Sequence, residues 1–113
     1  GDNDTLSANV AEMVDADLLI LLSDIDGLYS DDPRIDQIAR FISYVDSIDD
    51  HLEAMAKGAD TTFGTGGMAT KIAAAKLAGS AGVDMVIANG NRIGNINRIL
   101  EGKEVGTLFK ADK

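Results

Sequence analysis

The sequence feature that most constrains the fold is an apolar run, DLLILLS, at residues 17–23. A run of this kind, without polar alternation, is typical of a β-strand that is buried on both faces of a parallel sheet. The residues DIDG follow it directly and have the composition of a turn. The apolar centre of the run, residues 18–22, is the longest unbroken apolar stretch of the chain, far below the ~20 residues that cross a bilayer.

Helical and strand-like segments alternate along the rest of the chain and predict an α/β fold with a mostly parallel sheet. Helices are expected over residues 5–14, 50–57, 68–81 and 93–100, and further short strands over residues 41–45, 84–88 and 106–109, the last at an edge of the sheet. Asp4 is the expected N-cap of the first helix. The large apolar side chains of that helix are expected to share one face: Leu6, Val10, Met13 and Val14.

Composition narrows the classes of function. The chain of 113 residues has room for one domain, and because it lacks cysteine, a disulfide framework, a thiolate metal site and cysteine catalysis are excluded. The net charge of −9 disfavours nucleic acids and anionic membrane surfaces as partners, and five aromatic residues without tryptophan argue against base stacking. The first residues do not have the basic and apolar composition of a leader, so secretion is not expected. A cytoplasmic enzyme or binding domain is therefore expected.

The charge is unevenly distributed along the chain. Residues 1–60 carry fifteen acidic and three basic side chains, whereas residues 61–113 carry four acidic and seven basic ones. An anionic ligand such as a phosphate is expected to prefer the second part, and an amine or Mg²⁺ the first. The acidic run at residues 46–50 is most simply solvated surface. The first residues, which lack an initiator Met and are rich in turn and cap chemistry, indicate a piece of a longer protein.

The first candidate site is the segment GTGGMATK at residues 64–71. Its glycines let the backbone approach a ligand, its N–H groups can converge on phosphate oxygens, and the following helix presents its positive end to the same anion. Lys71, at the start of that helix, opposes the helix dipole by about 0.3–1 kcal/mol, a cost that a bound polyphosphate would reverse. The segment is not a Walker A loop, because Lys71 precedes isoleucine. A plain loop with an exposed lysine is the alternative.

Two further candidates carry acidic and amide side chains. Ligands of open α/β sheets bind beyond the carboxyl ends of the strands, where Ser23 and Asp24 could hydrogen-bond a nucleotide and the nearby carboxylates could hold Mg²⁺. The alternative is ordinary Asp-Gly turn chemistry. At residues 1–4 (GDND), two carboxylates and an amide could bind an amine or orient a lysine from another segment, and the alternative is a helix cap.

Other polar and sulfur-bearing residues are given structural interpretations. His51 is the single histidine and is expected at the surface, without a serine partner for catalysis. Met55, Met68 and Met85 are expected to fill gaps in the packing. The stretch NGN at residues 89–91 is expected to be the turn by which a strand leaves the sheet.

Taken together, five segments resemble the glutamate 5-kinase family of the amino acid kinase superfamily. They are GDNDTLSA (residues 1–8), ADLLILLSDIDGLYSDDPR (16–34), GTGGMATKIAAAKLA (64–78), VDMVIANG (83–90) and GTLF (106–109). The stretch GGM-x-x-K also resembles acetylglutamate kinases, and the first two segments make the resemblance specific. The resemblance implies an αβα sandwich and the transfer of the ATP γ-phosphoryl group, with Mg²⁺, to the side-chain carboxylate of L-glutamate, the first step of proline biosynthesis.

The resemblance also implies roles for individual residues. Asn3 matches a position that binds glutamate, and Asp4 matches an aspartate that organises the active-site lysines. Lys71 would neutralise charge on the transferred phosphoryl group. The residues that would contact the nucleotide are Ser23, Asp24, Thr65, Gly66, Gly67, Met68, Ala69, Thr70 and Lys71. No residue is expected as a direct metal ligand.

The chain also departs from the family pattern. The family's kinase domain is about twice as long and begins with a segment that supplies a second lysine and a serine for glutamate. Many members carry a PUA domain after GTLF, whereas this chain ends four residues later. Residues 1–113 are therefore expected to be the C-terminal, nucleotide-binding half of a kinase domain, inactive alone and homo-oligomeric when full-length. The alternatives are a kinase of the same fold for N-acetylglutamate or another small acid, and a non-catalytic nucleotide-binding module.

Overall fold

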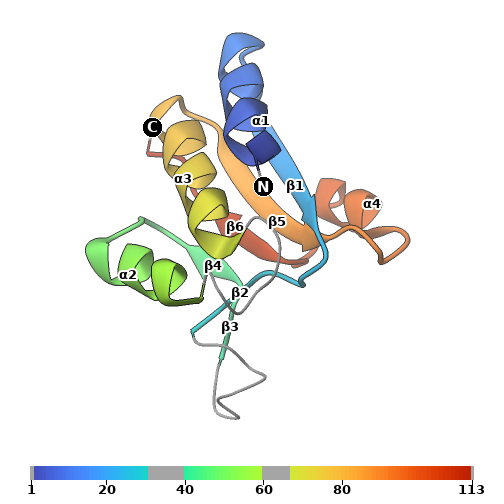
Figure 1. Ribbon diagram of the computed structural model, residues 1–113. Helices are drawn as coiled ribbons and strands as arrows, with labels where there is room; N and C mark the ends of the chain where they lie inside the picture. Colours follow the sequence, from blue (N-terminus) through green and yellow to red (C-terminus); the bar gives the residue numbers. More distant parts are fainter. Residues whose placement is uncertain (1, 31–39, 60–66, 113) are drawn as a thin grey trace.

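The computed structural model describes residues 2–30, 40–59 and 67–112 of the chain (Figure 1). Each expected helix is present, with bounds that differ from the predicted ones by a few residues. The helices are α1 (Asp2–Met13), α2 (Asp50–Ala59), α3 (Gly67–Ser80) and α4 (Asn95–Leu100). The strands are β1 (Leu18–Ser23), β2 (Leu28–Tyr29), β3 (Phe41–Ile42), β4 (Tyr44–Val45), β5 (Asp84–Asn89) and β6 (Thr107–Phe109).

The main sheet has four described strands in the order β1-β5-β6-β4. β1 is parallel to β5 and β4 is parallel to β6, whereas β6 is antiparallel to β5. The prediction of a mostly parallel sheet is thus confirmed. The prediction that the last strand lies at an edge is wrong, because β6 lies between β5 and β4 and buries Thr107 and Phe109 in the core. Gly106 permits this position: a Cβ there would lie 2.0 Å from the carbonyl oxygen of Ile87.

The predicted strand over residues 41–45 is divided between two sheets. β3 pairs with β2 in a separate antiparallel ladder, with Leu28 opposite Ile42, and β4 joins the main sheet. Tyr29 and Phe41 make an edge-to-face ring contact across the small ladder, with ring centroids 5.2 Å apart. The segment therefore links the main sheet to the ladder that follows the DIDG turn.

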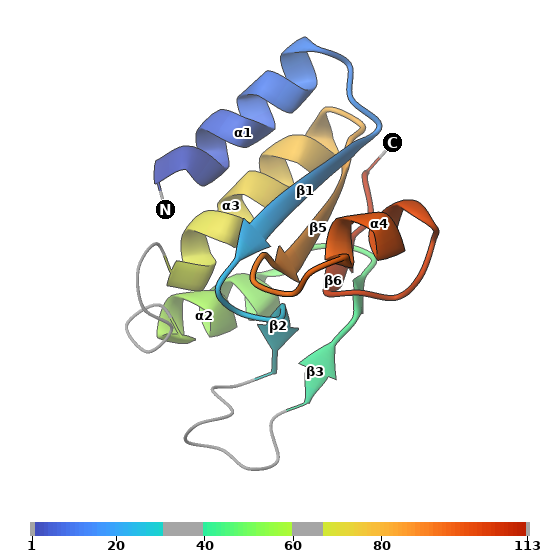
Figure 2. The same ribbon diagram turned by 90° about the vertical axis from the view of Figure 1, so that its right-hand side faces the viewer.

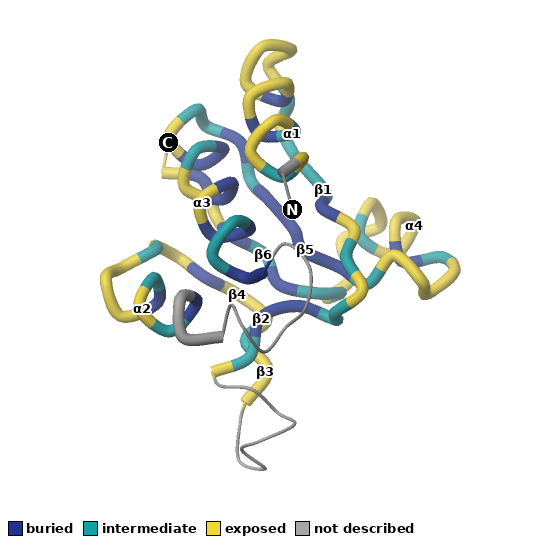
Figure 3. The backbone as a smooth tube through the Cα atoms, viewed as in Figure 1, coloured by how far each residue is buried: buried dark blue, intermediate teal, exposed yellow. Residues whose placement is uncertain are grey.

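Helices cover the main sheet unequally. α1, α2 and α3 lie on one face, and α4 lies on the other (Figures 1 and 2). The side chains of β5 that point toward α3 include Met85 and Ile87, both fully buried, and α3 contributes Ile72 and three alanines to the same core. Figure 3 shows this buried layer running through β5 and the inner side of α3. The arrangement is the expected α/β architecture with helices on both faces.

β1 is less enclosed than its composition predicts. Leu21 is buried, but Leu18, Leu19 and Ile20 are only partly buried and Leu22 is 50% exposed. β1 pairs with β5 on one side only among the described strands, and the short helix α4 covers only part of the second face. The prediction of burial on both faces is therefore wrong for this strand as described.

The first helix packs through its small residues. Ala8 and Ala11 are buried in the core, where α1 contacts α3. The large apolar residues predicted to share one buried face are instead between 47% and 83% exposed, and the last of them follows the end of α1: Leu6, Val10, Met13 and Val14. Small side chains allow two helix backbones to approach closely, so the alanines form the contact. The N-cap prediction is also wrong, because α1 begins at Asp2 and Asp4 lies inside the first turn.

Candidate functional site

The candidate residues gather at one end of the sheet. β1 and β5 are parallel, so their carboxyl ends meet, with Ser23 opposite Asn89. The helices α1 and α3 begin at the same end, beside the arrowheads of β1 and β5 (Figure 2). In open α/β sheets, ligands bind in the crevice beyond these strand ends. The fold therefore brings the segments at residues 2–4, 23–27 and 67–71 to the place where a ligand is expected.

An ion pair between α1 and α3 forms the centre of the site. Lys71 Nζ donates to Asp4 Oδ2 over 3.4 Å, although the two residues are 67 positions apart in the sequence. The Lys71 side chain is 9% exposed and that of Asp4 14% exposed. The hydroxyl of Thr70 donates to the same carboxylate oxygen at 3.3 Å. This direct contact supports the interpretation that an acidic residue of the first segment, Asp4, orients a lysine from another segment, Lys71.

The electrostatics of Asp4 follow from this position. Burial raises the pKa of the Asp4 carboxyl, whereas hydrogen bonding and positive charge, of which the Lys71 ammonium supplies only a part, together hold the pKa below its ordinary value. Asp4 is therefore ionised at neutral pH. Lys71 lies in the second turn of α3 rather than the first, and its ammonium is paired with a carboxylate instead of standing free in solvent. The exposed lysine that the alternative expects is therefore wrong, whereas the loop before α3 lies outside the described residues.

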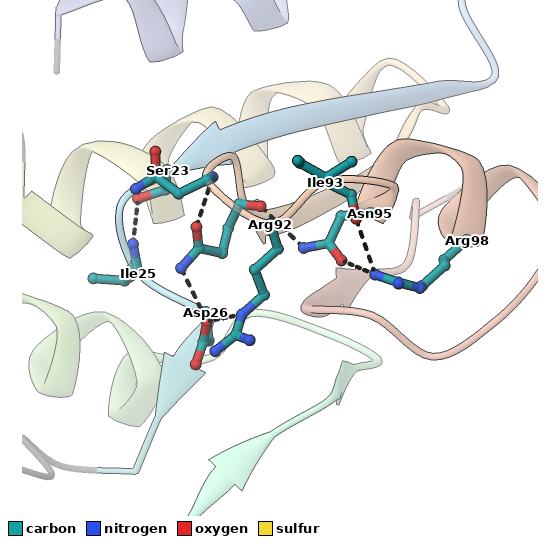
Figure 4. Close-up of polar contacts among 9 residues, drawn as sticks. Ser23, Ile25, Asp26, Arg92, Ile93, Asn95 and Arg98 are labelled. Carbon is teal, nitrogen blue, oxygen red and sulfur yellow. Dashed lines mark hydrogen bonds and ion pairs between the residues drawn. The ribbon is translucent and has the colours of Figure 1, made fainter.

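The turn after β1 has its own local hydrogen bonds. The hydroxyl of Ser23 donates to Asp24 Oδ1 at 3.3 Å. The backbone N–H of Ile25 donates to Ser23 Oγ at 3.3 Å (Figure 4). Asp24 is exposed and Ser23 partly buried. Both polar side chains thus lie at the end of β1, at the surface where a nucleotide can reach them.

Sequence reasoning missed the partners of Asp26. Asn89 Nδ2 donates to Asp26 Oδ1 at 3.1 Å, and Arg92 Nε donates to the same atom at 3.2 Å (Figure 4). The hydrogen bond from Asn89 lowers the pKa of Asp26, burial opposes it, and the Arg92 guanidinium adds to the lowering. The sequence does contain a signal for the Asn89 contact. Asn89 ends a predicted strand, and because the carboxyl ends of neighbouring parallel strands meet, its side chain can reach the turn that follows β1.

The remaining candidates have varied environments. Asn3 is exposed, and its backbone carbonyl accepts from the Ser7 hydroxyl at 2.8 Å. Gly67 and Met68 are buried, and Ala69 and Thr70 are partly buried at the start of α3. Thr65 and Gly66 lie outside the described residues. His51 is exposed, and the methionines pack inside or partly inside the fold, as expected: Met55, Met68 and Met85.

The described part of the chain holds neither a cluster of metal-binding side chains nor a membrane-spanning helix. Across residues 2–30, 40–59 and 67–112, no three His, Cys, Asp or Glu side chains are grouped so that they could hold a metal ion. In the same part of the chain, no helix has both the length and the apolar character needed to cross a membrane. The chemistry that the described site offers is a paired, buried ammonium at the beginning of a helix and polar groups at a strand end, which suits a multiply charged anion.

Comparison with known proteins agrees with this geometry. The model of the amino acid kinase family matches residues 1–89. A glutamate 5-kinase from Carboxydothermus hydrogenoformans is 58% identical over all 113 residues, which cover 30% of that protein. A glutamate 5-kinase from Clostridium tetani is 57% identical over the same residues, which cover 42% of it. The chain thus spans about a third to two fifths of the length of these relatives, and the resemblance inferred from the motifs is confirmed.

Solved structures support the fold. A structure of isopentenyl phosphate kinase is similar with a TM-score of 0.67 and 28% identity, over 95% of this chain and 36% of that one. The uridylate kinase from Archaeoglobus fulgidus is similar with a TM-score of 0.66 and 25% identity, over 94% of this chain and 45% of that one. The predicted fold class is therefore confirmed.

Proposed function

This chain belongs to the amino acid kinase family, and from that premise we propose that it is the nucleotide-binding part of a kinase that phosphorylates the side-chain carboxylate of L-glutamate with ATP. The product, γ-glutamyl phosphate, is an intermediate of proline biosynthesis. The observation that carries the proposal is the buried pair of Lys71 and Asp4 between α3 and α1. Both helices begin near the carboxyl end of β1, the strand that ends at Ser23 (Figure 2). The glutamate 5-kinases to which the chain is similar support the choice of acceptor.

The chemistry of phosphoryl transfer suits these residues. The reaction needs positioning and stabilisation of negative charge more than a covalent nucleophile. Lys71 would neutralise charge on the transferred phosphoryl group, and Asp4 would hold the ammonium in position. The acceptor carboxylate of glutamate is already ionised at pH 7, so no strong general base is required. This agrees with a site in which the single histidine, His51, takes no part.

Substrate and nucleotide contacts are assigned from the same reasoning. Asn3, exposed beside Asp4, would bind glutamate. Ser23 and Asp24 would contact the nucleotide from the end of β1. The phosphates would lie against the segment that includes Thr65 and Gly66 and continues into α3 through Gly67, Met68, Ala69 and Thr70 to Lys71. Mg²⁺ would arrive on the nucleotide phosphates and balance their charge.

The proposal requires further residues, outside these 113, to complete the active site. The similar glutamate 5-kinases are more than twice as long, so we expect the matching parts of such proteins to supply further substrate contacts. The 113-residue chain alone is therefore expected to bind nucleotide and to form little or no γ-glutamyl phosphate.

The experiment replaces the matching residues of the Carboxydothermus hydrogenoformans relative with this chain. The chimera is assayed for γ-glutamyl phosphate, trapped as the hydroxamate, with L-glutamate, N-acetylglutamate and other small acids as acceptors. Activity with L-glutamate that Lys71→Ala removes, in a chimera that melts cooperatively, is the expected result. Preference for another acid would instead support a kinase of the same fold, and a folded, nucleotide-binding chimera without activity would support a non-catalytic module.

A further inference from the structure

The turn between β1 and β2, residues 23–28, is held by residues to which the proposed function gives no role. We call it the β1–β2 turn. It carries Ser23 and Asp24, the proposed nucleotide contacts, yet its own internal hydrogen bonds are short-range ones at its first residues. Further hydrogen bonds reach the turn from the end of β5, from the β5–α4 loop and from β6, each more than sixty residues away in the sequence.

The centre of the β1–β2 turn is fixed by the carboxylate of Asp26. One oxygen of this carboxylate accepts from both Asn89 Nδ2, at 3.1 Å, and Arg92 Nε, at 3.2 Å (Figure 4). These bonds join the turn after β1 to the loop after β5. Two donors on one carboxylate oxygen restrict the rotation of the Asp26 side chain, and they also restrict the conformation of the backbone that carries it.

Both ends of the same turn are fixed as well. The backbone N–H of Gly90 donates to the carbonyl of Ser23 at 2.8 Å. At the other end, the N–H of Leu28 donates to the hydroxyl of Thr107 at 2.9 Å, and Thr107 is fully buried. The β1–β2 turn is therefore held at its beginning, its centre and its end.

Asn89 is itself held in place. Its side-chain oxygen accepts from the N–H of Asn91 at 2.8 Å, and its carbonyl accepts from Asn95 Nδ2 at 2.9 Å. Asn95 is 4% exposed, and its side-chain oxygen accepts from Arg98 at 3.0 Å (Figure 4). The amide that reaches Asp26 is thus preorganised by the loop that carries it, as a positioning group requires.

We propose that Asn89 and Arg92 are positioning residues that act through Asp26 to hold the β1–β2 turn in the form that presents Ser23 and Asp24 to the nucleotide. The nucleotide part of this inference rests on the proposed function. In this arrangement Asp26 acts as a hydrogen-bond acceptor, with its Oδ1 facing both an amide and a guanidinium.

The test uses two readouts on the 113-residue chain: the affinity for Mg·ADP by titration calorimetry, and hydrogen exchange of the backbone amides of Ile25 and Leu28. Asp26→Ala is expected to weaken Mg·ADP binding about tenfold, the effect of about one hydrogen bond to a charged group, and to speed exchange in the turn. Asp26→Asn keeps an acceptor oxygen and is expected to restore both. Arg92→Ala is expected to change both readouts in the same direction as Asp26→Ala, and Lys103→Ala is its control, because Lys103 is as exposed as Arg92 and pairs with Glu101 at 3.5 Å.

A double substitution tests the route of the effect. If Asn89 acts only through Asp26, then Asn89→Ala weakens binding in the wild-type background and adds nothing to Asp26→Ala. The inference is overturned if Asp26→Asn weakens binding as much as Asp26→Ala, since the carboxylate charge itself would then be required. It is also overturned if the alanine variants change neither readout. A wild-type chain that fails to bind Mg·ADP contradicts the proposed function and the nucleotide part of the inference, while the exchange rates still decide whether these bonds fix the turn.

Discussion

The pair of Lys71 and Asp4 gives a prediction whose size follows from its burial. At an effective dielectric constant of about 20, unit charges separated by the 3.4 Å between Nζ and Oδ2 attract by roughly 5 kcal/mol. Removing both charges from water offsets much of this attraction, and hydrogen bonds to charged groups contribute about 1.5–3 kcal/mol net. We therefore expect Lys71→Met, which keeps an unbranched side chain, to lower the free energy of unfolding of the unliganded chain by about 1.5–3 kcal/mol.

A double-mutant cycle isolates the interaction. Lys71→Met, Asp4→Asn and the double variant are unfolded in urea at pH 7, and the coupling free energy is expected to be about 1.5–3 kcal/mol. The matched control is Lys76→Met in a cycle with Glu53→Gln. That pair is closer, at 2.8 Å, but its side chains are 51% and 33% exposed, so we expect a coupling of about 0–1 kcal/mol. A coupling below about 0.5 kcal/mol for the buried pair, or a larger one for the exposed pair, would refute the reasoning that burial outweighs distance here.

The same variant links stability to the ligand. At a hundred times its dissociation constant, Mg·ADP should stabilise the wild-type chain by about 2.7 kcal/mol, which is several degrees in Tm for a domain of this size. In Lys71→Met we expect most of this shift to disappear, since the ammonium is the cation that the structure places at the start of α3. An unchanged shift in a variant that still melts cooperatively would mean that the phosphates lie elsewhere.

Three further outcomes are expected. Because the pKa of Asp4 is lowered in the folded chain, the difference in unfolding free energy between wild type and Asp4→Asn should be constant from neutral pH down to about pH 4. Below about pH 4 the difference should shrink, because the carboxylate becomes protonated. Urea unfolding at a series of pH values measures this difference, and its loss near pH 6 would contradict the prediction. Gly106→Ala should lower the free energy of unfolding by more than about 3 kcal/mol, because its Cβ would meet the Ile87 carbonyl. Gly102→Ala is the control: its φ is similarly positive but the space around it is open, so the free energy of unfolding should fall by only about 1–2 kcal/mol. Equal losses in the two variants would rule out the steric cause. Ala8→Leu should lower the free energy of unfolding by about 1–3 kcal/mol, because the larger side chain overfills the contact between α1 and α3. Thermal unfolding measures the change, and an unchanged stability would mean that the two helices separate easily.

Local sequence patterns predicted the helices and strands, whereas tertiary contacts determine which faces are buried and where each strand lies in the sheet. The apolar run of β1 and the alanine-rich α3 are recognisable because strand and helix periodicities are local properties. Which face of α1 is buried is not local: Leu6 and Val10 satisfy an amphipathic pattern, yet Ala8 forms the contact because only a small side chain fits there against α3. The internal position of β6 likewise depends on its contact with β5, which no local pattern within residues 106–109 encodes.

The candidate site could be predicted as a set of residues but not as a set of pairs. Lys71 and Asp4 were each recognisable from their neighbours in the sequence, whereas their contact depends on the packing of α1 against α3. Asp26 lay inside a recognised turn, but Arg92 lay in a segment that offered no motif of its own. Their bond exists because the parallel pairing of β1 with β5 places the two following loops side by side.

The site's contacts therefore depend on the same pairings as the fold. The Lys71–Asp4 pair spans 67 residues and requires α1 to be packed on α3, and the Asp26–Arg92 pair spans 66 residues and requires β1 to be paired with β5. Both contacts therefore depend on pairings between elements that are distant in the sequence. β1 is also the least enclosed of the long strands and lies at an edge of the described sheet. Local opening of β1 would separate Ser23 from Gly90 and release Asp26 from Asn89 before the core around β5 is disturbed, so nucleotide binding should be lost at lower denaturant concentrations than the core packing.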